Sequence, residues 1–115
     1  RLAIAMEPDT LIVPHRHPHT WEILTALRGR FTVLVFDDAG RVIQRAALGE
    51  DTSVVEIPAG AWHAVLSKDV DAVIFEVKHG PYKPIEDRDI AAWSKGHSAK
   101  ELNEWYAQAQ LGDEF

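Results

Sequence analysis

Cysteine is absent from this 115-residue chain, and so are an excess of basic residues and any long apolar run. Without cysteine there is no disulfide and no thiolate, so any bound metal must be held by nitrogen and oxygen atoms. The net charge of -6 argues against broad electrostatic binding to nucleic acid or to an anionic membrane. Apolar runs such as residues 72–75 are far too short to span a bilayer, and no leader pattern is visible. We expect a cytoplasmic protein that binds neither nucleic acid nor membrane.

The apolar residues are grouped in short segments separated by turn signals, which is typical of a β-sandwich or β-barrel. The segments are rich in valine, isoleucine, leucine and phenylalanine, and Gly40 allows a tight turn between two of them. With 46% hydrophobic and 26% charged residues, the chain is expected to form one domain over residues 1–115. Strands are predicted at residues 11–13, 22–27, 31–36, 42–46, 54–57, 61–66 and 72–77.

The C-terminal part has a different pattern. Residues 98–101 read Ser-Ala-Lys-Glu, a capping box that predicts the start of a helix. Leu102, Trp105, Tyr106 and Ala109 follow at helical spacing. We therefore expect an amphipathic helix over about residues 98–110, with its Leu102/Trp105 face packed on the outside of the barrel.

Three histidines and one glutamate are the candidate metal ligands. His15 and His17 are separated by one residue, so on a strand both side chains would point to the same face. Glu22 lies on the following predicted strand, and His63 comes after a tight turn much later in the chain. Either block alone also fits a surface strand or a plain turn, and Glu22 can instead orient an imidazole. Together they predict one mononuclear site with ligands His15, His17, Glu22 and His63, which leaves coordination positions open for water or substrate.

These residues match the two motifs of the cupin superfamily. The motifs read His15-x-His17-x4-Glu22-x6-Gly29 and Pro58-x-Gly60-x2-His63. Residues 14–17, 36–40, 55–63 and 75–82 further resemble the WbuC-type cupin fold metalloproteins, and this resemblance extends to Trp93. It implies an all-β double-stranded β-helix, or jelly-roll barrel, over about residues 2–80, followed by the C-terminal helical segment. It also implies a homodimer.

The resemblance further implies one divalent transition metal ion, which nitrogen and oxygen ligands allow to be zinc, iron, nickel or manganese. Relatives of the WbuC type are associated with bacterial gene clusters for surface polysaccharide. The expected ligand is therefore a small molecule of carbohydrate type, such as a sugar or sugar-nucleotide intermediate of O-antigen biosynthesis. Whether the chain is an enzyme is left open, because a non-catalytic metal-dependent binding module or a structural metal site fits the same residues.

If the metal supports catalysis, a proton-transfer group must stand beside it. The sequence offers four candidates for this role, namely Glu56, Glu76, His19 and Tyr82. Each has a plainer alternative. Glu56 and Glu76, with Lys78, fit an outward strand face slightly better, His19 fits a solvated turn, and Tyr82 fits a loop anchor as well as a substrate contact.

Overall fold

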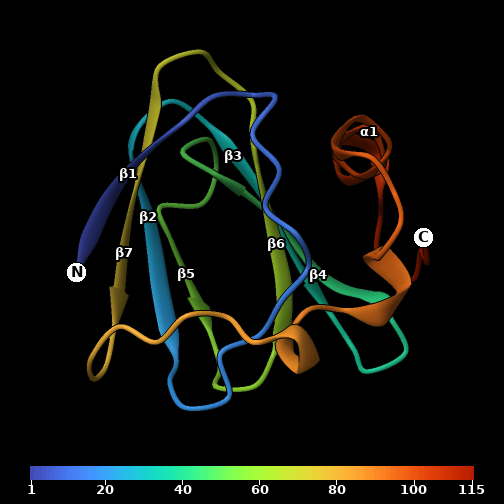
Figure 1. The fold of residues 1–115 in the computed structure, drawn as a ribbon. Helices are drawn as coiled ribbons and strands as arrows, with labels where there is room; N and C mark the ends of the chain where they lie inside the picture. The colour runs from blue at the N-terminus through green and yellow to red at the C-terminus, as the bar shows by residue number, and fades with distance from the viewer.

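Seven strands form two antiparallel sheets that face each other (Figure 1). The computed structural model describes all 115 residues. The first sheet has the order β1 (Leu2–Met6), β7 (Ala72–Lys78), β2 (Glu22–Arg28) and β5 (Val54–Ile57). The second has the order β4 (Val42–Leu48), β3 (Phe31–Phe36) and β6 (Trp62–Ser67). The all-β class and the C-terminal helix predicted from the sequence are confirmed.

The space between the sheets is filled by alternate side chains of nearly every strand. Phe31 and Val33 of β3 face Leu24 of β2 and Ile74 of β7, and all four are buried. This follows from the period of two along a strand, which sends every second residue to one face. The same alternation decides which polar side chains enter the barrel, because Glu22 shares a face with Leu24, and His63 shares a face with Val65.

Helix α1 (Ala99–Gln108) covers the outer face of the three-stranded sheet (Figure 1). It begins as predicted, because the Ser98 hydroxyl accepts a hydrogen bond from the Glu101 N–H at 3.1 Å. Leu102 and Tyr106 are buried against the sheet. At its other end, the Arg45 guanidinium donates hydrogen bonds to three of its last carbonyls. With the helix outside and the barrel core inside, every residue of β3 is buried.

Two parts of the strand assignment need correction. Residues 11–13 are not a strand. Side chains of α1, and not a neighbouring strand, hydrogen-bond to the backbone of this part of the chain. Tyr106 donates its hydroxyl to the Ile12 carbonyl at 3.0 Å, and Asn103 donates to the Thr10 carbonyl. Conversely, β1 was not predicted as a strand, although it pairs with β7 over its whole length. No helix is both long and apolar enough to cross a membrane.

The connection between β7 and α1 runs along one end of the two sheets (Figure 1). It contains two short 3-10 helices, η1 (Asp87–Asp89) and η2 (Ala92–Ser94), where no regular element was predicted. Residues 89–91, called the strap below, run beside the segment that carries His15 and His17. The Ala91 N–H donates to the Pro14 carbonyl at 2.8 Å, and the Arg16 N–H donates to the Asp89 carbonyl at 3.0 Å. The strap therefore holds the segment that carries His15 and His17 in place.

Candidate metal centre

His15 and His17 lie on an extended segment that is hydrogen-bonded on both sides. The His15 N–H donates to the His63 carbonyl at 3.0 Å, and the His63 N–H donates back at 2.9 Å. The strap bonds the opposite side. The expectation that the two histidines lie on a strand is wrong, because His15 forms only isolated bridges. Pro14 and Pro18 enclose the pair and lack the N–H that a longer ladder would need.

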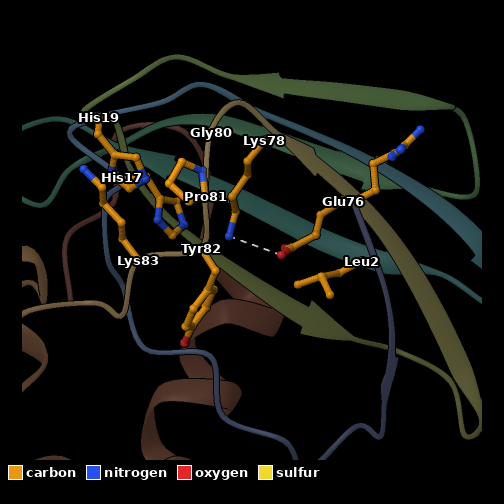
Figure 2. A pocket seen from close by; sticks show the side chains of 10 residues that line it. Leu2, His17, His19, Glu76, Lys78, Gly80, Pro81, Tyr82 and Lys83 are labelled. Atoms are coloured by element: carbon orange, nitrogen blue, oxygen red, sulfur yellow. Dashed lines mark ion pairs between the residues drawn. The ribbon is translucent and has the colours of Figure 1, made fainter.

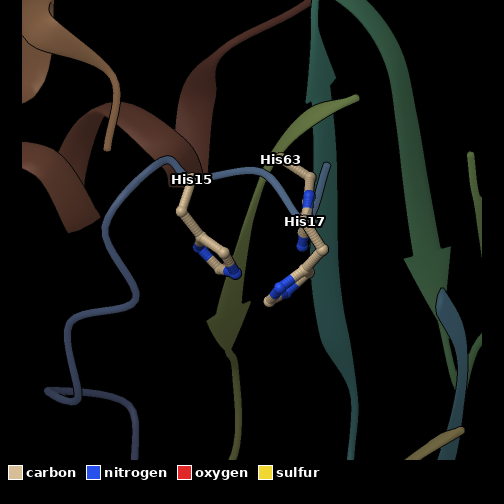
Figure 3. Close-up of side chains that lie close together, drawn as sticks. All are labelled: His15, His17 and His63. Carbon is tan, nitrogen blue, oxygen red and sulfur yellow. The ribbon is translucent and has the colours of Figure 1, made fainter. Parts of the chain in front are cut away.

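The three imidazoles converge inside the barrel (Figure 3). The ring centroids of His15 and His63 are 4.4 Å apart, and that of His17 is 4.9 Å from His15 and 5.4 Å from His63. One nitrogen from each ring lies within 4.8 Å of the others. All three side chains are buried. This buried group can hold a metal ion, as the spacing of the two motifs predicted.

Glu22, the first residue of β2, lies at the same place. Its Oε2 atom lies 2.9 Å from Nε2 of His63 and 3.7 Å from Nε2 of His17. Its Oε1 atom lies 3.9 Å from the ammonium of Lys78. Glu22 is only 3% exposed, so its charge must be balanced by these neighbours. A carboxylate at this position supplies the negative charge that a divalent cation requires.

His15, His17 and Glu22 are held in the protonation states that metal ligands need. Burial and the neighbouring His63 lower the pKa of His15 to about 3, and burial with the charge of Lys78 lowers that of His17 to about 4. Burial alone would raise the pKa of Glu22, but the neighbouring His63, Glu76 and the charge of Lys78 outweigh burial and lower it to about 2. Near neutral pH, His15 and His17 are therefore neutral and Glu22 is ionised, which is the state in which both kinds of side chain bind metals.

Hydrogen bonding at the site leaves lone pairs without partners. Nδ1 of His15 donates to the Val13 carbonyl at 2.7 Å, and Nδ1 of His63 donates to the Ala61 carbonyl at 3.0 Å. In a neutral ring this puts the lone pair on Nε2, so the lone pair of His63 faces Oε2 of Glu22. Nε2 of His17 and Oε2 of Glu22 are buried and have no hydrogen-bond partner. A cation among these atoms would satisfy all of them, so the residues present fit a metal ion.

Glu76 and Lys78 point into the barrel beside this group. Glu22 lies opposite Lys78 in the β2–β7 register, and Leu24 lies opposite Glu76. The outward placement favoured for Glu76 and Lys78 is therefore wrong. The signal was present in the sequence, because both share the period-two face of Ala72 and Ile74, which are core residues.

The four acid–base candidates lie in different places. Glu76 lines the cavity next to the imidazoles. Burial and its contact with Glu22 raise the pKa of Glu76, so it holds its proton to a higher pH than an ordinary glutamate. His19 and Tyr82 line a second cavity farther out. Glu56 is exposed on β5 and is not brought to the site.

A cavity of about 310 Å³, called the inner cavity below, opens beside the imidazoles. Its wall includes all four predicted ligands, Glu76 and Lys78, and the remainder is mostly apolar. A cavity of this kind, mostly apolar with a few convergent polar groups, is typical of small-molecule sites. The candidate metal centre is therefore accessible to a ligand rather than sealed inside the core.

Asp89 is expected to matter for metal binding although it is not a ligand. Its carboxylate accepts a hydrogen bond from Nε of Arg16 at 3.0 Å, and the Arg16 guanidinium lies 4.5 Å from the ring centre of Trp62. Asp89→Asn removes the ion pair that joins the strap to the histidine segment. We expect the affinity for zinc to fall about 10-fold, in the range found for residues that orient metal ligands. Competition with a chromophoric chelator measures it.

The matched control is Asp87→Asn, because Asp87 is exposed on the same 3-10 helix and pairs only with Lys95. Its zinc affinity should equal that of the unmodified chain. If Asp89→Asn lowers the melting temperature but leaves the zinc affinity unchanged, the ion pair stabilises the fold only, and its positioning role is refuted.

Comparisons with known proteins identify the fold. Residues 1–48 match a family described as "Domain of unknown function (DUF6016)". No curated protein sequence matches the chain. The solved structure of the WlaRB TDP-quinovose 3,4-ketoisomerase from Campylobacter jejuni is similar, with a TM-score of 0.65 and 14% identity over 82% of this chain and 70% of that chain. A 3,4-ketoisomerase from Helicobacter canadensis has a TM-score of 0.64 and 15% identity over 93% and 74% of the two chains. At these identities the likeness concerns the fold alone: the chain has a cupin-like fold, as its two motifs predicted.

Proposed function

We propose that this chain is a single-domain, mononuclear metal-binding cupin that acts on a small carbohydrate ligand. The metal ligands in this proposal are His15, His17, Glu22 and His63. The observation that carries it is the convergence of three buried imidazoles and one ionised carboxylate on the wall of an open cavity. When bound, a divalent ion supplies Lewis acidity to a carbonyl or hydroxyl oxygen of the ligand.

The side chains around the ligands support a role in proton transfer. Glu76 lines the inner cavity, and its Oε1 atom lies 3.2 Å from the ammonium of Lys78. Burial raises the pKa of Glu76 toward the working pH, which suits a group that gives and takes a proton. Isomerisation of a sugar needs such a group beside the polarised oxygen. We therefore propose Glu76 as the acid–base group and Lys78 as the residue that holds its carboxyl group in position.

The carbohydrate class is supported by the fold neighbours and by the cavity. Both neighbours are named as 3,4-ketoisomerases, and one of them is named as a TDP-quinovose 3,4-ketoisomerase. The inner cavity, at about 310 Å³, has the size of a site for a monosaccharide-sized ligand. We propose a sugar or a nucleotide-linked sugar of a bacterial surface-polysaccharide pathway as substrate.

The alternative of a purely structural metal predicts a closed site. The open inner cavity argues against that alternative. A binding module without turnover would use the same residues, so only an assay of catalysis separates it from an enzyme.

The test begins with metal content. The chain is prepared without chelators, and the metal bound per chain is measured by elemental analysis, together with zinc, iron, nickel and manganese reloading. We expect one ion per chain. Each loaded form is then incubated with TDP-linked and UDP-linked keto sugars, and the products are followed by proton NMR.

Glu76→Gln keeps the shape of the side chain and removes its acid–base function, so it is the matched variant. It should bind metal normally and lose turnover. A chain that binds no metal in any preparation refutes the proposal. A chain that binds metal and sugars tightly but converts none of them is a binding module.

A further inference from the structure

A second cavity of about 390 Å³, called the outer cavity below, adjoins the inner cavity (Figure 2). The two cavities share His17, Glu76 and Lys78 in their walls. The outer cavity is bounded by the end of β7, by residues 80–83 and by His19. A ligand that extends through both cavities would have one end beside the imidazoles and the other among residues 80–83.

The outer cavity carries a positive charge on a chain whose net charge is -6. Its wall holds three cationic side chains, Arg1, Lys78 and Lys83, and a single carboxylate, Glu76. His19 and Tyr82 add a ring nitrogen and a hydroxyl to the same wall. No carboxylate lies within ion-pair distance of Lys83.

Lys78 occupies the junction between the cavities. Its ammonium lies 3.2 Å from Oε1 of Glu76 and 3.9 Å from Oε1 of Glu22, as the dashed line in Figure 2 marks for the first pair. An ammonium carries three donors, and the side chain remains 26% exposed. Lys78 can therefore keep its glutamate partner and still donate to a ligand. Lys83 faces the same space from the loop.

We infer that the outer cavity binds an anionic group of the ligand, a phosphate or a carboxylate, while the rest of the ligand reaches the metal centre. This inference rests on the proposed function and adds the charge of the substrate to it. Lysine ammonium groups bind such anions through charge-assisted hydrogen bonds. A neutral ligand would cover Lys83 without giving its ammonium group a charged partner, which costs free energy.

The test compares three probes of similar size, namely glucose, glucose 1-phosphate and glucuronate. Each is titrated into the zinc-loaded, 15N-labelled chain at low salt, and amide shifts are recorded. We expect at least one anion to bind about 10-fold or more tightly than glucose and to shift the amide signals of His19, Lys78, Gly80, Tyr82 and Lys83. Whether glucose 1-phosphate or glucuronate binds more tightly distinguishes phosphate from carboxylate. Salt should weaken this binding.

Lys83→Gln is the main variant, because Lys83 lies outside the metal centre, and it should weaken anion binding about three- to tenfold. Lys100→Gln is the matched control, since it removes the same charge from the exposed face of α1 and should change nothing. Equal affinity for all three probes, no binding at millimolar concentration, or shifts confined to His15 and His63 would overturn the inference.

Metal content is measured on the same samples, so two kinds of failure can be told apart. If the zinc-loaded chain binds the anions no more tightly than glucose, the anion site is refuted and the proposed function is left intact. Chain that binds the anions through Lys83 but takes up no metal refutes the proposed function and leaves the anion site intact.

Discussion

Replacing His63 with alanine should lower the affinity of the chain for zinc by more than about 100-fold. Residues that merely orient metal ligands contribute about 10- to 100-fold, and a ligand itself contributes more. His63 lies next to the rings of His15 and His17 and next to the carboxylate of Glu22. Its loss therefore removes the central member of the group. Isothermal titration of the metal-free chain with zinc measures the effect.

Two further variants make this result specific. His19→Ala is the control, because His19 is exposed, its ring centroid is 6.3 Å from that of His17, and it lies outside the convergent group. It should bind zinc like the unmodified chain. His17→Gln repeats the test at the edge of the cavity if His63→Ala folds poorly, since His63 is buried within a strand. Equal zinc affinity for His17→Gln and His19→Ala would exclude the proposed ligand set.

The metal-free chain should lose stability steeply as the pH falls from about 6.5 to about 4. The pKa of His15 falls from 6.5 to about 3 on folding, and that of His17 from 6.5 to about 4. In this window the unfolded chain binds more protons than the folded one, so the free energy of unfolding decreases with decreasing pH. Each unit of pKa difference is worth about 1.4 kcal/mol, so the total should reach several kcal/mol.

Glu22 extends the same trend, because its pKa falls from 4.5 to about 2 on folding. Glu76 opposes it in part, since its pKa is raised and its contribution to stability is lost as the pH rises above 4.5. Urea unfolding of chelator-treated protein across this range gives the slope. His15→Gln should flatten the curve, because glutamine does not titrate. A free energy of unfolding that is independent of pH would show that the imidazoles are hydrated in the folded chain.

The composition of the strands explains why most of the fold was predictable. Six of the seven strands are short apolar-rich segments between turn signals, and their positions depend mainly on local pattern. β1 has a weaker pattern, since it contains no valine and no aromatic residue, and it pairs with β7 over its whole length. The stretch at residues 11–13 is apolar enough for a strand, but it is hydrogen-bonded to Tyr106 of α1 and not to a neighbouring strand.

The grouping of His15, His17, Glu22 and His63 was predictable because four residue types at fixed spacing are a specific signal. Their local geometry was not, since the histidine segment is shaped by Pro14, Pro18 and the strap rather than by strand pairing. The inward direction of Glu76 and Lys78 was readable from Ile74, whereas contacts with the strap depend on residues far along the chain. The homodimer, the identity of the metal and the cytoplasmic location stay predictions.

The double hydrogen bonding of the histidine segment has a consequence for synthesis of the protein. His15 is translated well before its backbone partners on β6 and in the strap. A nascent chain that ends before residue 91 already contains all four predicted ligands. It lacks the complete strap, which is one of the two segments that bond the backbone around His15. We therefore expect uptake of an ion in the native geometry only after residues 89–91 have been made.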